Sequence, residues 1–113
     1  MSKRLHQRIA HLSIEAMPEE VCGFVCKGKA VRVRNMSDNP EESFLIDAET
    51  YLEHQSDTIF HSHPTGTDGF SEHDRVVAAN MELTSYVYVV EADRLEVWSA
   101  DNGLQVFEKV LKP

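Results

Sequence analysis

The first part of the chain carries a helical pattern of apolar positions. Between residues 3 and 16 apolar side chains recur every three or four positions, and they are Leu5, Ile9, Leu12 and Ala16. This spacing aligns them along one stripe of an α-helix, so the segment is predicted to be an amphipathic helix that packs against an apolar surface. Pro18 is expected to end it.

The next two segments have the pattern of paired β-strands. Residues 21–26 form an apolar run, and residues 31–34 alternate valine with arginine. The Lys-Gly-Lys sequence at 27–29 between them is expected to turn the chain. Together they predict a β-hairpin, with strands over 21–26 and 30–34, whose first strand is the more buried of the two.

The middle of the chain is more polar. Residues 35–42 are expected to form an irregular loop, and the apolar residues 44–46 to form a short strand. Asp47 has a side chain suited to a helix N-cap, so a brief helix is predicted from there to about Gln55.

The second half of the chain alternates strand and helix patterns and then ends in a meander, with a hairpin signal at Asp101-Asn102-Gly103. Its predicted elements are strands over 58–63, 86–90, 95–99 and 104–110 and a helix over 71–83. The strand over 86–90 is continuously apolar, which predicts burial on both faces. The whole order of elements predicts an α/β fold, with a mixed β-sheet and flanking helices, in one domain that covers residues 1–113.

Composition and charge narrow the class of partner. The chain is 42% apolar and 27% charged, as in an ordinary globular protein, and no apolar run approaches the roughly 18 residues of a membrane span. The net charge of −8 argues against a nucleic-acid partner, because the phosphate backbone would be repelled. One local basic cluster is expected either to be a solvated hairpin surface or to dock an acidic partner, and it consists of Lys27, Lys29, Arg32 and Arg34.

Two features point to the cytoplasm. Cys22 and Cys26 would lie about 13 Å apart on one strand, too far for a disulfide, so both are expected to be buried thiols in a reducing compartment. The basic N-terminus is followed by no apolar segment of the kind that a secretory signal needs.

Residues 61–74 have the composition of a metal site. On the strand predicted over 58–63, His61 and His63 point to the same face, and the glycine-containing loop after Pro64 would return Asp74 towards them. Two imidazoles and one carboxylate, with a fourth position left for water, form the open tetrahedral site of a catalytic zinc.

Other uses of these residues are open at this point. Ser71 and Asp74 also have the spacing of a capping box, which fixes the start of a helix and needs no metal, and both roles can hold at once. Two histidines and a carboxylate can also bind non-haem iron, although the carboxylate usually lies between the histidines in sequence, and here it follows both. His73, between the motif positions, is expected at the surface.

His61 and His63 form an H-x-H motif, Asp74 follows after ten further residues, and Ser71 lies three residues before Asp74. This arrangement resembles the signature of the JAMM metallopeptidases, also called MPN-plus domains. The resemblance implies a zinc metallopeptidase with a cytidine-deaminase-like sandwich, in which His61, His63 and Asp74 bind the metal. It further implies that Glu20, in a sequence that matches the pattern E-x-C-G, is the general base and acid, and that the hydroxyl of Ser71 stabilises the oxyanion.

The resemblance covers nearly the whole chain and is strongest to a prokaryotic branch. Residues 35–47 and the pair Tyr51-Leu52 look like the N-terminal domain of lambda-type phage tail assembly proteins. A free-standing domain is also similar to bacterial JAMM peptidases that release cargo from ubiquitin-like sulfur carrier proteins. The implied partner is therefore a protein or peptide substrate, such as a ubiquitin-like tail or a phage tail protein; the alternative is a non-catalytic MPN scaffold or binding module in tail assembly.

Overall fold

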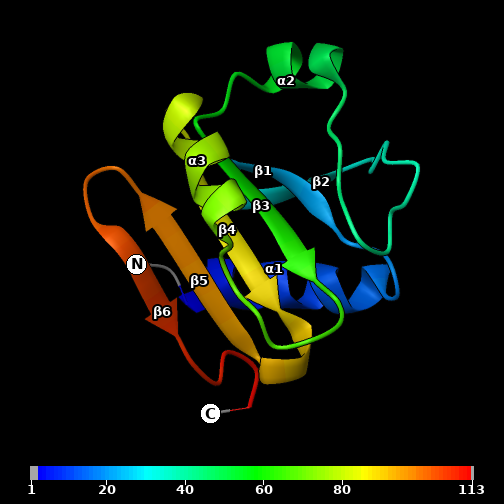
Figure 1. Ribbon diagram of the computed structural model, residues 1–113, viewed down its shortest axis with the longest axis vertical. Helices are drawn as coiled ribbons and strands as arrows, with labels where there is room; N and C mark the ends of the chain where they lie inside the picture. Colours follow the sequence, from blue (N-terminus) through cyan, green and yellow to red (C-terminus); the bar gives the residue numbers. More distant parts are fainter. Residues whose placement is uncertain (1–2, 113) are drawn as a thin grey trace.

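The structure, a computed structural model, describes residues 3–112, apart from the side chains of residues 73 and 77. Its centre is one six-stranded sheet with the strand order β2-β1-β3-β4-β5-β6 (Figure 1). Strands β3 and β4 run parallel, and the other neighbouring pairs run antiparallel, so the sheet is mixed. The strands are β1 (Cys22–Cys26), β2 (Lys29–Val33), β3 (Thr58–His63), β4 (Thr84–Val89), β5 (Arg94–Ser99) and β6 (Gly103–Phe107).

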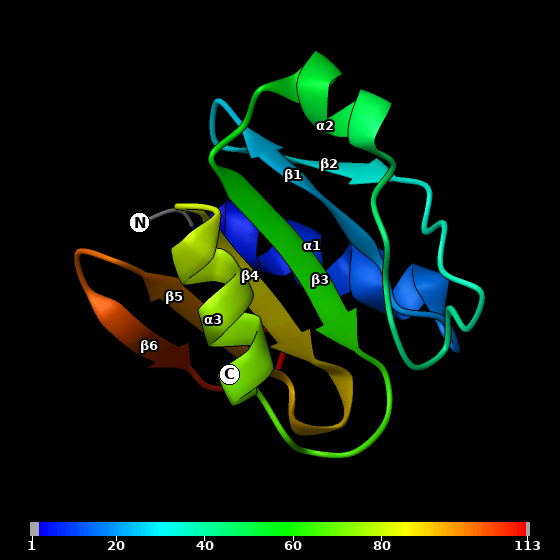
Figure 2. The same ribbon diagram turned by 45° about the horizontal axis from the view of Figure 1, so that its top comes forward.

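Helices cover both faces of this sheet. Helix α1 (Lys3–Ala16) lies behind it, and helix α3 (Glu72–Asn80) lies in front of β4 and β5, as Figures 1 and 2 show. Helix α2 (Ala48–His54) lies beyond one end of β1, and a single 3₁₀ turn, η1 (Val90–Ala92), follows β4. The predicted α/β fold, a mixed sheet with flanking helices, is confirmed. No helix within residues 3–112 combines the length and apolar character needed to cross a bilayer.

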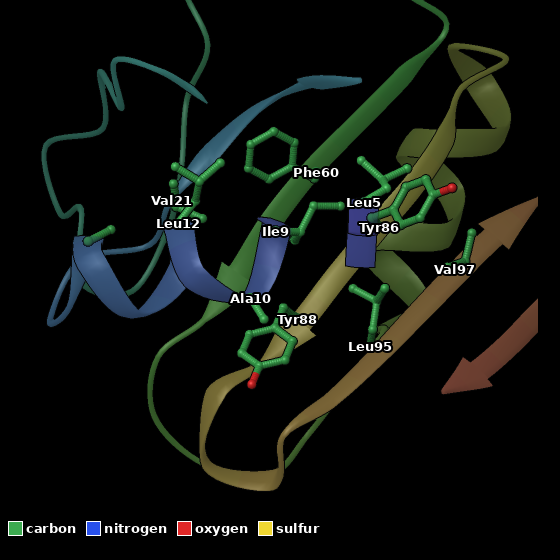
Figure 3. Packing of buried hydrophobic residues seen from close by; sticks show 11 residues of the cluster. Leu5, Ile9, Ala10, Leu12, Val21, Phe60, Tyr86, Tyr88, Leu95 and Val97 are labelled. Atoms are coloured by element: carbon green, nitrogen blue, oxygen red, sulfur yellow. The ribbon is translucent and has the colours of Figure 1, made fainter. Parts of the chain in front are cut away.

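The larger core lies between α1 and the sheet (Figure 3). The apolar stripe of α1 packs on Phe60 of β3 and on aromatic and aliphatic side chains of β4 and β5, and both Ile9 and Phe60 are fully buried. Complete burial of such a side chain stabilises a fold by about 1.5–3 kcal/mol. The buried Tyr88 keeps its hydroxyl paired, because it donates a hydrogen bond to Asp93 Oδ1 at 2.6 Å.

A smaller core lies on the opposite face of the sheet, under α3 and the loop before α2. Its buried members are Cys22, Phe24, Ile46, Ile59 and Leu83. Because side chains alternate along a strand, this is the face to which His61 and His63 point, while Phe60 and Ser62 point towards α1. The smaller core is therefore the floor beneath the candidate metal site.

Most predicted elements are confirmed. Helix α1 and strand β3 have the predicted bounds, and β1 is more buried than β2. Strand β4 runs over Thr84–Val89 rather than the predicted 86–90, because Val90 begins the 3₁₀ turn η1. It is almost wholly buried, as predicted for a strand covered on both faces. Both cysteines are free thiols; Cys22 is buried as predicted, whereas Cys26 is only half-buried.

One predicted strand does not form, two predicted elements end three residues too late, and most other predicted bounds differ by one or two residues. Residues 44–46 form no strand, because Leu45 is held by one backbone bond to Met36 and by the side chain of Asn35 rather than by a neighbouring strand. Helix α3 ends at Asn80, where Glu82 takes a left-handed φ of 55° and the Leu83 amide caps the Ala78 carbonyl. Strand β6 ends at Phe107 rather than at residue 110.

Candidate metal centre

Strand β3 presents the two histidines of the candidate site. His61 is buried and His63 is half-buried, and their ring centroids are 5.2 Å apart. The strand lies between β1 and β4; β4 pairs with both His61 and His63, and β1 pairs with His61. The spacing His-x-His on this strand therefore places both imidazoles on one face, as the sequence predicted.

The first turn of α3 supplies the carboxylate. Ser71 Oγ accepts a hydrogen bond from the Asp74 amide at 3.0 Å, and Asp74 Oδ2 accepts one from the Ser71 amide at 3.1 Å. This reciprocal capping box fixes the start of the helix. It also turns the Asp74 carboxylate to the histidines, with Oδ1 4.0 Å from His61 Nε2 and Oδ2 3.9 Å from His63 Nε2.

Each imidazole has a nitrogen that is suited to metal binding. His63 Nδ1 lies 2.8 Å from the carbonyl oxygen of Asp68, and because a carbonyl can only accept, Nδ1 carries a proton; the neutral form of this ring then has its lone pair on Nε2. Burial lowers the pKa of His61, so this imidazole is neutral at physiological pH. Phe44 stacks on the His61 ring with a centroid distance of 4.4 Å, which limits the ring's rotation.

The three residues fit a metal such as zinc in donor type and approximately in spacing. Their candidate ligand atoms lie within 4.8 Å of one another. A tetrahedral centre with bonds of about 2.0–2.1 Å separates its ligand atoms by roughly 3.4 Å, so binding would draw the group together slightly. His61 faces Asp74 with Nε2, while its Nδ1 has no hydrogen-bond partner within residues 3–112. The group could hold a metal ion with one coordination position open to the cleft.

Glu20 is brought to the same place by strand pairing. Cys22 is paired with His61 across β1 and β3, so the same register two residues earlier sets Glu20 beside His63. The bond from the Ser62 amide to the Val21 carbonyl continues the pairing in this direction. Glu20 is thus close to the histidines in space although 41 positions separate it from His61 in sequence.

The surroundings of Glu20 change its acidity. The side chain is 7% exposed, and burial, followed by the negative charge of Asp74, raises its pKa from 4.5 to about 7. Its backbone is held on both sides, because the Glu20 amide donates to the Pro40 carbonyl and the Asn35 side chain donates to the Glu20 carbonyl. A buried carboxyl group with a pKa near 7 can both take up and release a proton at neutral pH.

All the site residues named from the sequence line one cleft of about 530 Å³: Glu20, His61, His63, Ser71 and Asp74. Glu19, the neighbouring carboxylate, is exposed and lies outside that lining. Asp68 contributes its backbone carbonyl, while its side chain is exposed. The expectation for His73 concerns a side chain outside the described part of the structure.

Sequence reasoning missed three residues that support the site. Phe44 covers His61, Asn35 fastens the loop over 35–45 to the backbone of Glu20, and Ser62 Oγ accepts the Val21 amide at 2.9 Å. Phe44 was assigned to a strand that does not form. Only Ser62 carried a signal, as a small polar residue between the two histidines of a strand that is otherwise largely buried.

Comparisons with known proteins agree with this architecture. The fold is similar to the solution structure of protein DSY2949 from Desulfitobacterium hafniense, with a TM-score of 0.66 and 19% identity over 95% of this chain and 88% of that chain. At that identity the likeness concerns the fold alone. No curated protein sequence matches this chain. Residues 2–101 match the family described as prokaryotic homologs of the JAB domain, and because this match spans most of the sequence, the chain belongs to that family.

Proposed function

We propose that the protein is a zinc-dependent metallopeptidase of the JAMM type that hydrolyses a peptide or isopeptide bond. The observation that carries the proposal is the position of Glu20: a buried carboxyl group with a pKa of about 7 lines the same cleft as His61, His63 and Asp74. A metal site that only stabilised the fold would not require such a group beside it. Hydrolysis of an amide does require one, because a proton must leave the attacking water and another must reach the leaving nitrogen.

Each residue has a distinct task in this proposal. A zinc ion held by His61, His63 and Asp74 would supply a Lewis acid that polarises a water molecule and the substrate carbonyl. Glu20 takes the proton from the water and returns it to the leaving nitrogen. Ser71 Oγ already accepts the Asp74 amide, so its own proton is free to be donated to the oxygen of the attacked carbonyl.

The walls of the cleft support a protein or peptide substrate. Next to the polar group the lining is largely apolar, including Phe44, Ile46, Tyr51, Ile59 and Met81. Such a surface suits an extended peptide with an apolar side chain. A ubiquitin-like tail and a phage tail protein are the two substrate classes that we propose, and the cytoplasm is the proposed compartment because both cysteines are free thiols.

Metal analysis tests the site first. Protein purified without chelator is expected to carry about one zinc per chain, and His63→Ala and Asp74→Ala are expected to lose most of it because each removes one of three protein ligands. His11→Ala, which removes an exposed histidine of α1, is the matched control. A native chain that takes up no zinc, even after zinc is added, would refute the proposed metal site.

Peptide hydrolysis then tests the chemistry. Glu20→Gln is expected to keep its zinc and to lose cleavage of a peptide library, because the amide cannot take up the proton. Glu19→Gln, with an exposed side chain, is expected to remain active. If Glu20→Gln cleaves as fast as the native chain, Glu20 is not the base.

The second candidate function is a non-catalytic scaffold. The observation in its favour is the capping box, because the hydrogen bonds between Ser71 and Asp74 give both residues a purpose in the fold without a metal. In that case Glu20→Gln and His63→Ala should bind the same partner proteins as the native chain does, and no variant should differ from the native chain in hydrolysis.

A further inference from the structure

The loop over residues 64–70 joins the two halves of the candidate metal site. It leaves β3 directly after His63 and enters α3 just before Asp74, and its Asp68 carbonyl orients the His63 ring. The loop contains no helix or strand. Its position must therefore be fixed by contacts with the rest of the protein.

Side chains of β5 provide those contacts. Glu96 is 7% exposed, and its Oε1 accepts the Phe70 amide at 2.9 Å. Its Oε2 accepts Arg94 Nε at 2.8 Å, and Arg94 Nη2 donates to the Thr67 carbonyl. The carboxylate and the guanidinium thus pair with each other while each also holds one backbone group of the loop.

The loop packs closely against this pair. A Cβ added at Gly69 would lie 1.9 Å from Glu96 Oε2, so the backbone passes directly over the carboxylate. Earlier in the loop, the Gly66 amide donates to the carboxylate of Glu91 in η1. A side chain at position 69 would therefore have to displace the Glu96 carboxylate from its present position.

We propose that Glu96, with Arg94, is a positioning residue for the metal site, and that it fixes the loop so that the Asp68 carbonyl keeps His63 in the form with a free Nε2. The proposal rests on the proposed function for its link to metal binding. A buried carboxylate is unfavourable unless it is paired and hydrogen-bonded; here Arg94 of the same strand pairs with it, and the Phe70 amide of the loop donates to it. Groups that orient a ligating histidine commonly change metal affinity about 10–100-fold when they are removed.

A double-mutant cycle on zinc affinity tests the contact from both sides. Glu96→Ala is expected to weaken zinc binding about 10-fold or more, and Gly69→Ala is expected to act similarly because its methyl group displaces the carboxylate. In the double variant the methyl group meets no carboxylate, so the double variant should lose about as much zinc affinity as Glu96→Ala alone. Glu108→Ala, with an exposed side chain, is the control. Native affinity in Glu96→Ala, or additive losses in the double variant, would overturn the proposal.

A measurement on metal-free protein separates this proposal from the proposed function. Long-range ¹H–¹⁵N NMR reports which nitrogen of His63 carries the proton, and His11 and His54 serve as internal references. The native chain is expected to hold the proton on Nδ1, and Glu96→Gln and Glu96→Ala are expected to shift His63 towards a mixture of tautomers. If the native chain binds no zinc but this shift occurs, the proposed function fails and the positioning role stands. An unchanged His63 spectrum in folded variants refutes the positioning role whatever the metal result.

Discussion

Glutamine at position 20 should make the metal-free protein more stable at alkaline pH. Burial and the neighbouring Asp74 charge raise the pKa of Glu20 from 4.5 to about 7. Each pKa unit corresponds to about 1.4 kcal/mol, so ionisation of this carboxyl group costs the folded state roughly 3 kcal/mol relative to the unfolded chain. Glu20→Gln keeps the shape of the side chain and removes that cost.

The stability contributed by Glu20 decreases with rising pH, because folding raises the pKa of this carboxyl group. In the unfolded chain Glu20 releases its proton near pH 4.5, whereas in the folded chain it holds the proton until about pH 7. Between these values the folded state binds more protons, so the contribution of Glu20 to stability is fully present below pH 4.5 and is lost as the pH rises through 7. The free energy of unfolding of the variant, relative to the native chain, should therefore grow by roughly 2.5 kcal/mol between pH 5 and pH 8.

Urea denaturation with a chelator present, measured at several pH values over this range, gives the comparison directly. Glu19→Gln removes an exposed carboxylate next along the chain and should follow the native profile throughout. Parallel profiles for Glu20→Gln and the native protein would refute the reasoning, because they would mean that Glu20 has the same acidity in the folded and unfolded chains.

Three further changes have defined outcomes. Ser71→Ala removes the cap of α3 and should lower the free energy of unfolding by about 1 kcal/mol in chemical denaturation; a variant as stable as the native chain would contradict the capping role. Under the proposed function the same variant should also slow hydrolysis by about 100-fold or more. Phe60→Ala opens a cavity in the fully buried core under α1 and should cost about 3–5 kcal/mol, which thermal unfolding would detect; a loss below about 1 kcal/mol would contradict this packing. His6 contacts Phe107, and its Nε2 has no hydrogen-bond partner in the described chain. Because burial lowers the pKa of His6, the folded protein loses stability as the pH falls below 6.5, the ordinary pKa of histidine. His6→Leu should therefore melt at a higher temperature than the native chain at pH 5, with a smaller difference at pH 8; an equal difference at both would show that His6 titrates normally.

Local pattern was sufficient for much of the fold. The apolar stripe of α1 and the run that forms β3 depend on residues close together in sequence, and both elements have the predicted bounds. The segment 44–46 was predicted wrongly because an apolar triplet does not show whether a partner strand is available. Its position is set instead by Asn35, whose side chain binds backbone groups on both sides of the loop.

Some residues of the candidate site could be predicted from nearby sequence, and others depend on tertiary contacts. His61, His63 and Asp74 lie within one short segment, so strand alternation and a returning loop were enough to predict that they meet. Glu20 could be named only through resemblance, because its approach depends on the pairing of β1 with β3. Glu96 carried no signal in the sequence, since a glutamate at an alternating strand position ordinarily faces solvent. Only the tertiary structure shows it buried against the loop.

The parallel pair β3–β4 has a consequence for how the site tolerates damage. Parallel neighbours need a crossover connection, and here the crossover contains α3, so both histidines and Asp74 belong to a single βαβ unit. Glu20 lies outside this unit, in the segment that leads into β1. Loosening that segment or the loop at Asn35 would move Glu20 away and leave His61, His63 and Asp74 together. Under the proposed function, changes in the N-terminal half alone would therefore remove hydrolysis without separating the three proposed metal ligands.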